Sequence, residues 1–414
     1  MKWRRRSVVG WWLVACFFAQ AFYAPASWAI PAWARKYGVS CNVCHRPNVP
    51  RLNDYGHRFR KLGYRVPEEV GQQPEYKEIG QYIAMRGRMR YELEDFERGQ
   101  NTSRFKWNDA TLFYAGSVTE NLSSFFEWEW EDQDEIGLNG QFSWLFGGPD
   151  RYAQIRLGQM HTLSRVGWAG FDRPSGISTT DVIGSTLTTS AVPFTLAKDQ
   201  RGLELAVGLN PDIRLIGQIT NGLNEAGNGN SGSQDDDTEK DVLLAYEHML
   251  GDRGSGLTAL FYRGTWHQAA GTVVSGSALV DDDSQTQFDY YRYGLTGSWV
   301  FPSPLFKDTE GEVQGGAIFA NDRLPVDYPG GKLHADGQAY FVGLEQYFKD
   351  ASVFSRLDFR NIEVSGGDNW RRKYVLGSAK QVNDHLRLAI EGFVKDQESA
   401  NDSFGTQAEA MFNF

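Results

Sequence analysis

The stretch Ile83 to Leu93, IAMRGRMRYEL, alternates in character from one residue to the next. On an extended chain, one face would carry Arg86, Arg88 and Arg90, and the other Met85, Gly87, Met89 and Tyr91. The stretch 125–131, FFEWEWE, repeats the pattern, with Glu127, Glu129 and Glu131 set against Phe126, Trp128 and Trp130. A soluble sandwich also alternates, but rows of like charge would not line its core. The pattern indicates strands of a transmembrane barrel, with charges facing a wet lumen and aromatic residues facing lipid.

Similar alternation recurs along the chain in segments of about ten residues. It predicts about sixteen strands, an even number as in bacterial barrels. Their ranges are 82–93, 105–118, 122–132, 138–146, 152–161, 201–208, 212–221, 240–250, 255–266, 288–301, 312–323, 338–348, 351–364, 371–382, 385–398 and 404–414. No apolar run after residue 29 reaches the roughly 20 residues of a transmembrane helix, which excludes a helical membrane protein.

The connections between these strands alternate in length. Short turns such as VTEN (118–121), GGPD (147–150), NPDI (210–213), FKD (348–350) and VND (382–384) are expected on the periplasmic side, with long polar segments outside. The longest connection, Thr162 to Gln200, is the third outer one. General porins fold a loop inward at that position, although an ordinary surface loop would fit the sequence as well.

The last strand ends on an aromatic residue. In AEAMFNF, outward positions fall at Ala408, Ala410, Phe412 and Phe414. A terminal aromatic residue resembles the signal by which the barrel assembly machinery recognises its clients. Together with the alternation and the turn lengths, it predicts the outer membrane of a Gram-negative bacterium, with lipid around the barrel.

The N-terminus has the features of a signal peptide. Residues 1–29 hold a basic start, an apolar run from Val8 to about Ala24 and the small-x-small site Ser27-Trp28-Ala29. A lipoprotein box ending at Cys16 is an alternative, but a strongly apolar stretch would then follow the lipidated cysteine. The arginine run could also serve twin-arginine export, although an ordinary basic start explains it equally well.

Removal of this segment leaves two cysteines, Cys41 and Cys44, followed directly by His45. C-x-x-C-H is the attachment pattern of c-type haem, in which both thiols bond to the haem vinyl groups and the imidazole binds the iron. A structural zinc site needs about four ligands, and the mature chain has no second cysteine pair. A thioredoxin-like pair would stand near a βαβ pattern, which is absent. The motif therefore predicts one covalently bound haem c, with His45 as a metal ligand, and leaves no thiol for a disulfide.

The second axial ligand is less closely specified by the sequence. His57 follows twelve residues after His45, in a stretch (52–62) that could form a short helix, and it could reach the opposite haem face. A solvent-facing histidine beside Arg58 and Arg60 is the alternative. Met85 and Met89 are further candidates, since no methionine lies between Lys2 and Ala84. Ligation by His57 would make a low-potential bis-histidine haem.

Composition adds two expectations. The formal net charge of −10 and the pI of about 5.3 argue against nucleic acid as a partner. Two acidic runs, Asp235 to Asp237 and Asp281 to Asp283, could gather cations such as ferrous iron near the mouth, although solvated acidic loops are commoner.

The sequence thus predicts an all-β membrane protein: an outer-membrane β-barrel of about sixteen antiparallel strands with a small N-terminal α-helical monohaem cytochrome c segment. The expected division is a signal peptide at 1–29, a haem segment at 30–79 and a porin-like barrel at 80–414. A haem segment of about fifty residues is small for an independent globule. We therefore expect it to plug or cap the barrel and to carry electrons across the membrane.

IPAWARKYGVSCNVCH (30–45), followed by Pro50, Leu52-Asn53, Gly56, Phe59 and Gly63-Tyr64, resembles the fused monohaem cytochrome-porin family of outer-membrane proteins. Studied members of that family oxidise ferrous iron at the cell surface. The resemblance covers about Ile30 to Tyr64, and across the barrel it is one of architecture only. It implies an electron-transfer protein with Fe(II) oxidase activity, with Fe(II) as donor and a periplasmic c-type cytochrome as acceptor. By position it carries over only Cys41, Cys44 and His45 as haem-binding residues.

Other functions remain open at this point. They are extracellular electron transfer to or from another donor or acceptor, and a diffusion porin in which the haem segment is a structural plug. A peroxidase or gas sensor would need an open iron position.

Overall fold

The structure is a computed structural model that describes fourteen ranges of the chain. They are 32–47, 51–97, 101–131, 136–161, 176–180, 199–222, 239–251, 253–267, 273–274, 278–279, 287–324, 334–364, 367–398 and 402–414. The signal peptide predicted at 1–29 and both acidic runs, 235–237 and 281–283, lie outside these ranges.

The described elements begin with short helices and continue as strands. The helices are α2 (Ala32–Tyr37), η1 (Cys41–Val43), α3 (Asp54–Lys61), η2 (Pro67–Glu69) and η3 (Ile79–Gln81). The first half of the strands is β1 (Ile83–Phe96), β2 (Thr102–Ser117), β3 (Leu122–Glu131), β4 (Ile136–Gly147), β5 (Tyr152–His161), β6 (Asp199–Gly208), β7 (Ile213–Thr220), β8 (Asp241–Leu250) and β9 (Ser255–His267). The rest are β10 (Val273–Val274), β11 (Ala278–Leu279), β12 (Gln287–Pro302), β13 (Glu310–Arg323), β14 (His334–Tyr347), β15 (Ala351–Val364), β16 (Gly367–Asn383), β17 (Leu386–Gln397) and β18 (Ser403–Asn413).

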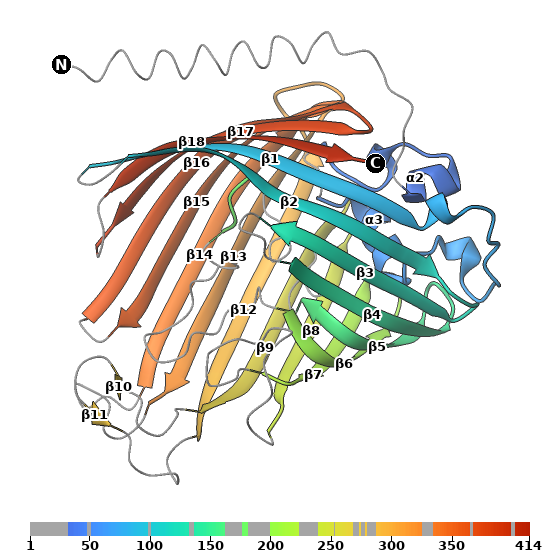
Figure 1. The fold of residues 1–414 in the computed structure, drawn as a ribbon, viewed down its shortest axis with the longest axis horizontal. Coiled ribbons are helices and arrows are strands. Elements are labelled where there is room, and N and C mark those ends of the chain that lie inside the picture. Colours follow the sequence, from blue (N-terminus) through green and yellow to red (C-terminus); the bar gives the residue numbers. More distant parts are fainter. Residues whose placement is uncertain are drawn as a thin grey trace.

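Sixteen of these strands form one closed antiparallel barrel, as the alternation predicted (Figure 1). Each strand pairs with its neighbours in sequence, except that β9 pairs with β12 because β10 and β11 form a separate two-stranded sheet. The last strand closes the ring on the first, with Gly87 opposite Phe412 and Tyr91 opposite Ala408. Closure leaves no strand edge with unpaired backbone groups, which a barrel in lipid requires.

The predicted strand boundaries agree with the observed ones to within four residues. The largest differences are at β14, which starts at His334 instead of 338, and at β16, which starts at Gly367 instead of 371. The extra residues of β14 are partly polar but still pair with β13, for example His334 with Arg323. Backbone pairing therefore continues past the apolar alternation from which the boundary was inferred.

The two faces of the barrel wall have the predicted composition. Met85 and Met89 are 44 % and 45 % exposed on the outer face of β1, whereas Arg86 between them is 8 % exposed. Trp128 and Trp130 of β3 are likewise exposed on the outside. Other exposed apolar side chains on the strands include Leu203, Leu205, Leu244, Leu295, Val342, Leu344, Val353, Leu376 and Val394. Such an apolar outer band matches a barrel surrounded by lipid chains.

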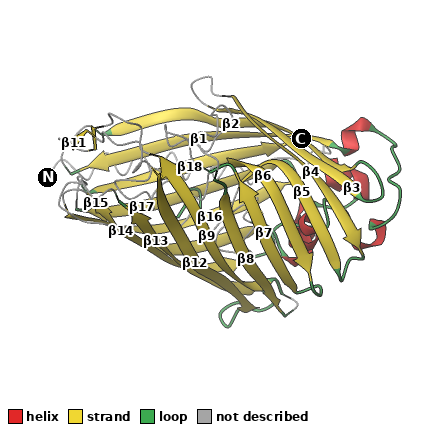
Figure 2. Cartoon of the chain, turned by 90° about the horizontal axis from the view of Figure 1, so that it is seen from below, coloured by secondary structure: helices red, strands yellow, loops and turns green. Residues whose placement is uncertain are grey.

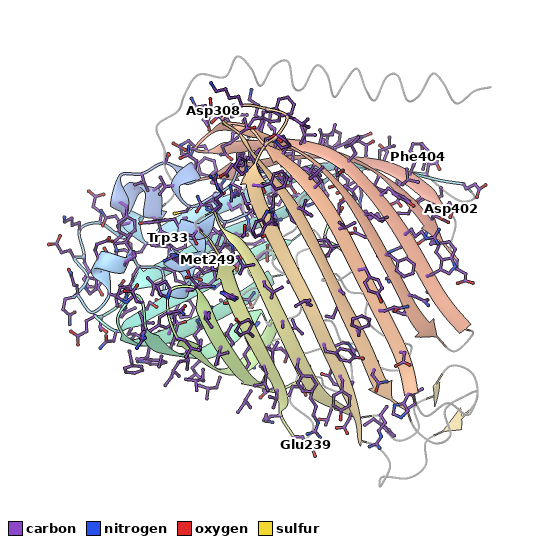
Figure 3. The ribbon with its side chains drawn as sticks, turned by 180° about the vertical axis from the view of Figure 1, so that it is seen from behind. Trp33, Glu239, Met249, Asp308, Asp402 and Phe404 are labelled. Carbon is purple, nitrogen blue, oxygen red and sulfur yellow. The ribbon has the colours of Figure 1, made fainter. Side chains whose placement is uncertain are left out.

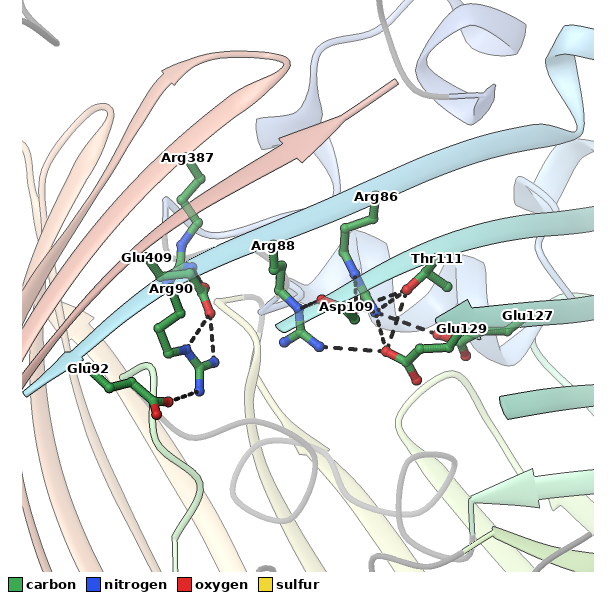
Figure 4. A network of polar contacts seen from close by, with 10 residues as sticks. All are labelled: Arg86, Arg88, Arg90, Glu92, Asp109, Thr111, Glu127, Glu129, Arg387 and Glu409. Carbon is green, nitrogen blue, oxygen red and sulfur yellow. Dashed lines mark hydrogen bonds and ion pairs between the residues drawn. The ribbon is translucent and has the colours of Figure 1, made fainter. Parts of the chain in front are cut away.

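Charged side chains on the inner face neutralise one another across strands (Figure 4). Arg86 contacts Asp109 at 2.6 Å and Glu129 at 3.3 Å, which ties β1 to β2 and β3. Glu409 of β18 accepts from Arg90 at 2.7 Å and from Arg387 at 2.9 Å. The rows of arginine and glutamate read from the sequence thus face each other inside the barrel as paired charges.

The helices gather at one end of the barrel (Figure 2). We call residues 32–82 the N-terminal segment, and we call this end the short-turn end, because the turns 118–121, 209–212, 348–350 and 384–385 lie there. The three longest connections, 162–198, 221–240 and 268–286, begin and end at the opposite end, which we call the long-loop end. Figure 3 shows Glu239 and Asp402 at the long-loop end, away from Trp33 of the segment. Among the described residues, no helix has the length and apolar character needed to cross a membrane.

Candidate functional site

The C-x-x-C-H motif folds as a tight loop whose backbone is fastened to helix α3. Residues 41–43 form a 3₁₀ turn, and the His45 N–H donates to the Cys41 carbonyl at 2.9 Å. The Asn53 side chain accepts from the Gly56 N–H at 3.0 Å and so caps α3. Its amide nitrogen also donates to the carbonyls of Asn42 and Val43, at 3.2 Å and 3.0 Å. One asparagine therefore fixes both the start of the helix and the position of the motif.

A glycine lets the helix lie directly against the motif. A Cβ on Gly56 would overlap the carbonyl oxygen of Cys44, which is backbone and cannot rotate away. The Asn53 N–H donates to the same carbonyl at 3.0 Å. The predicted helix in 52–62 is thus confirmed as α3, and its contact with the motif depends on a residue without a side chain.

Cys41 and Cys44 are both of intermediate exposure. Burial, reinforced by Asp384, raises the pKa of Cys41 to about 12, and burial raises the pKa of Cys44 to about 11. The Cys41 N–H also donates to the Asp384 carboxylate at 3.3 Å, which places the motif beside the β16–β17 turn.

His45 opens onto a cavity of about 600 Å³ between the N-terminal segment and the barrel. The segment contributes Asn42, His45, Arg46, Pro47 and Asn53 to the lining. The barrel contributes Arg253, Pro302, Ser303, Asp308, Thr309, Glu310, Tyr347, Phe348 and Lys349. A volume of this size lies within the usual range of about 300–1,000 Å³ for ligand and cofactor sites.

The structure does not bring His57 to this cavity. Its side chain is 6 % exposed on the inner face of α3 and does not line the cavity of His45. Burial, together with Arg60 and Lys61, holds the pKa of His57 well below its ordinary value. The ring is therefore neutral, the form in which a histidine can bind a metal. His57 as second axial ligand stays a prediction, and so do Met85 and Met89, which are 44 % and 45 % exposed on the outer face of β1.

The described residues contain no group of three or more His, Cys, Asp or Glu side chains arranged to hold a metal ion. The inner-face carboxylates of Glu127 and Glu129 instead lie near Arg86, at 3.7 Å and 3.3 Å.

Buried polar contacts connect the segment to the mouth of the barrel. Arg51 pairs with Glu312 of β13, and the two side chains are 7 % and 2 % exposed. Lys61 pairs with Glu247 of β8 at 3.0 Å, where the glutamate is fully buried. Arg65 donates to three carbonyls at the β2–β3 turn, those of Thr119, Glu120 and the first β3 residue, Leu122, at 2.7 to 2.9 Å.

An aromatic stack adds an apolar contact to these pairs. The Tyr64 ring lies between Trp33 of α2 and Phe125 of β3, with ring centroids 5.1 Å and 5.2 Å apart and nearly parallel planes. Phe59 of α3 meets the Trp33 ring edge-on at 5.3 Å. Stacked and edge-on pairs of this kind stabilise an interface beyond their buried area. These contacts support the expectation that the segment plugs or caps the barrel.

The long connection 162–198 reaches the opposite wall of the lumen in its described part, residues 176–180 (Figure 1). The backbone N–H groups of Ile177 and Ser178 donate to the Glu391 carboxylate of β17 at 2.6 Å and 3.2 Å. The Ser178 hydroxyl accepts from Lys373 of β16 at 2.5 Å and from Arg356 of β15 at 3.2 Å. These strands are far from β5 and β6 around the ring, so this stretch lies inside the barrel as a porin-like loop would.

The residues around the motif fit a covalently attached haem. Cys41 and Cys44 have the required spacing, the adjacent His45 faces a cavity, and the cavity has aromatic and cationic lining residues. The barrel's share of this lining was not predicted from the sequence. Arg253, Phe348 and Lys349 stand in ordinary turns more than 200 residues after the motif, and no local pattern marks them.

No family model matches the chain, and no curated protein matches it. Solved structures match it in fold. An anion-selective porin from Comamonas acidovorans aligns with a TM-score of 0.56 at 9 % identity, over 80 % of this chain and 98 % of that one. A loop-deletion mutant of OmpT, an outer membrane protein of Vibrio cholerae, gives 0.53 at 14 % identity, over 80 % and 99 %. Salmonella typhi OmpF gives 0.53 at 11 %, over 84 % and 99 %. At such identities the likeness concerns fold alone: the chain has the closed antiparallel barrel of outer-membrane porins.

Proposed function

We propose that this protein is an outer-membrane electron-transfer protein. One haem c, attached at Cys41 and Cys44 and bound by His45, would accept electrons from extracellular Fe(II) and pass them to a periplasmic c-type cytochrome. The observation that carries the proposal is the placement of the motif: His45 opens onto a cavity of about 600 Å³ where the segment meets the barrel. The cleaved signal peptide at 1–29 would deliver the chain to the compartment in which such haems are attached.

The position of the segment supports a direction for the reaction. Short turns mark the periplasmic end of bacterial barrels, so the motif would face the periplasm and its electron acceptor. Strand β1 has 14 residues, which at about 3.3 Å per residue gives roughly 46 Å along the wall. Because the motif would face the periplasm, extracellular Fe(II) would have to enter the lumen from the long-loop end, about this distance away, and would meet the segment inside the barrel.

A haem held by Cys41, Cys44 and His45 would supply one-electron transfer, so that each Fe(II) would become Fe(III) and its electron would pass to a one-electron acceptor. The chain's own residues supply position. Asn53 and Gly56 hold the motif against α3, and the Arg51–Glu312 pair holds the segment in the barrel mouth. Glu127 and Glu129 line the lumen beside Arg86 and are best regarded as a wet barrel wall.

Two measurements on the purified, full-length protein test the proposal. Haem staining after denaturing electrophoresis, with a pyridine haemochrome assay, should give one covalent haem per chain in the native protein and none in a Cys41→Ala/Cys44→Ala variant. Stopped-flow absorbance of the oxidised protein mixed anaerobically with Fe(II) should then show rapid haem reduction. Absence of covalent haem would overturn the proposal. Haem that dithionite reduces but Fe(II) does not would move the function to another donor or to the opposite direction of transfer.

A diffusion porin with a structural haem plug is the second candidate. The inward position of residues 176–180 and the fold of the matched porins favour it. Planar-bilayer recordings distinguish the two: a steady open channel in the native protein would favour the porin, and a closed barrel would favour electron transfer.

A further inference from the structure

The barrel contributes more lining residues to the cavity beside the motif than the N-terminal segment does. Five lining residues come from the N-terminal segment and nine from the short-turn end of the barrel. Six of the nine stand in the β8–β9 connection, the β12–β13 connection and the β14–β15 turn, and Pro302, Glu310 and Tyr347 are the strand residues directly beside them. Whatever occupies the cavity is therefore in contact with the rim of the barrel.

Arg46, the residue after His45, connects the two sides of the cavity. The Arg46 guanidinium pairs with Glu310 at 2.6 Å and donates to the Arg253 carbonyl at 2.6 Å. It also lies over the Tyr347 ring, 5.0 Å from the centroid. A residue adjacent to the expected iron ligand is thus fixed by three contacts to the barrel.

The lining combines an aromatic surface with an excess of positive charge. Tyr347 and Phe348 supply aromatic rings, and Phe348 is itself held edge-on by Phe306, with ring centroids 5.3 Å apart. Three cations and two carboxylates, Asp308 and Glu310, line the cavity, and Glu310 pairs with two of the cations, Arg46 and Arg253. The third, Lys349, has an exposed ammonium for which the described residues provide no ion pair. A flat apolar ring with carboxylate substituents matches such a lining.

We propose that the barrel rim forms the second half of the haem pocket, with Tyr347 and Phe348 against the macrocycle and with Lys349 and Arg253 as partners of the propionates. The inference rests on the proposed function, since it requires that haem is attached at the motif. It makes the segment and the barrel a single cofactor site, and the properties of the haem depend on residues about 200 to 300 positions away from the motif.

The test uses full-length protein and two lysines of the rim. Lys349→Gln removes a cation from the cavity, whereas Lys307→Gln removes another exposed cation, from the β12–β13 connection, that does not line the cavity. A positive charge near haem favours the reduced form, so Lys349→Gln should lower the midpoint potential. At fixed ambient potential the ratio of reduced to oxidised haem should fall about two- to threefold, more at low salt. Lys307→Gln should leave it unchanged, and Lys349→Arg should restore the native value.

A second readout needs no electron transfer. An amine-reactive reagent should label Lys349 several-fold more slowly in the haem-loaded protein than in the Cys41→Ala/Cys44→Ala chain, while Lys307 is labelled equally in both. One haem per chain, with equal potentials for the two lysine variants and equal labelling of Lys349 in both chains, would overturn the shared pocket and leave the proposed function standing. Absence of haem from the native protein would instead remove the proposed function itself.

Discussion

Glu312→Gln is the substitution that most directly tests whether the N-terminal segment is fixed in the barrel. Glu312 and Arg51 are 2 % and 7 % exposed, so the substitution removes the carboxylate that contacts the buried Arg51 charge and leaves Glu345 as an anion near it. The single glutamine oxygen can still accept from the Tyr347 hydroxyl, but an amide NH2 group then faces the Arg51 guanidinium, so the substitution removes both the charge and the acceptor of Arg51. Breaking a buried pair in this way costs about 3–5 kcal/mol. At about 1.4 kcal/mol per factor of ten, the equilibrium between docked and undocked segment shifts by roughly a hundredfold to several thousandfold.

Hydrogen exchange measured by mass spectrometry can detect this shift. Amides of α3, such as the His57 N–H that donates to the Asn53 carbonyl at 3.0 Å, exchange when the segment leaves the barrel and opens. Their exchange should accelerate by about a hundredfold or more in Glu312→Gln, while peptides from β5 and β6 keep their native rates. Bilayer recordings of the same variant should show brief openings that the native protein lacks.

The matched control is Glu75→Gln, which removes an ion pair with Lys77 in the same segment, at 2.8 Å but on the surface. Because both of its side chains are solvent-exposed, this variant should exchange like the native protein. Exchange of α3 amides that stays within about threefold of the native rate in Glu312→Gln would refute the idea that the buried pair holds the segment.

Three further substitutions address other contacts. Gly56→Ala should push α3 away from the Cys44 carbonyl and destabilise the segment by about 1–3 kcal/mol, seen as a lower midpoint of segment unfolding and a lower yield of attached haem. Burial lowers the pKa of Lys61 to about 8, so an unfolded or undocked segment binds more protons between about pH 8 and 10.5. Docking should therefore strengthen as the pH rises through that window, by at most about 1.4 kcal/mol per pH unit, and Lys61→Met should abolish the dependence in hydrogen exchange. Glu391→Gln should weaken the binding of residues 176–180 to the barrel wall by about 1.5–3 kcal/mol. In protein whose segment has been undocked by Glu312→Gln, the same substitution should raise the single-channel conductance.

The Gly56 and Glu391 variants each have a control in the same part of the chain. Gly80→Ala meets its nearest neighbour at 3.9 Å and should behave like the native protein, so equal losses at Gly56 and Gly80 would contradict the close-approach argument. Asp396→Asn alters an exposed pair with Arg372 on the strand that carries Glu391, and it should leave the conductance unchanged. Docking that weakens between pH 8 and 10 would contradict the sign derived for Lys61.

The barrel could be predicted almost completely from the sequence. Alternation is a property of the extended chain itself, so Arg86 and Met85 reveal the two faces of β1 without knowledge of their neighbours. The haem motif is equally local, since its two thiols and its imidazole lie within five consecutive residues. The strand ends of β14 and β16 were less accurate, because hairpin pairing continues into polar residues that carry no alternation.

Contacts between residues distant in sequence were decided by the tertiary structure alone. Closure brings β18 beside β1, and the folding back of the segment brings Arg51 to Glu312 and Arg46 to Glu310, more than 250 residues away. The inward path of residues 176–180 likewise depends on Glu391, on the far side of the ring. Such contacts leave no periodic signal, because their free energy comes from burial and from charge pairing that exist only after the barrel has closed. Periodicity along the chain thus determined the strands and the motif, whereas the closed ring decided which residues surround the motif.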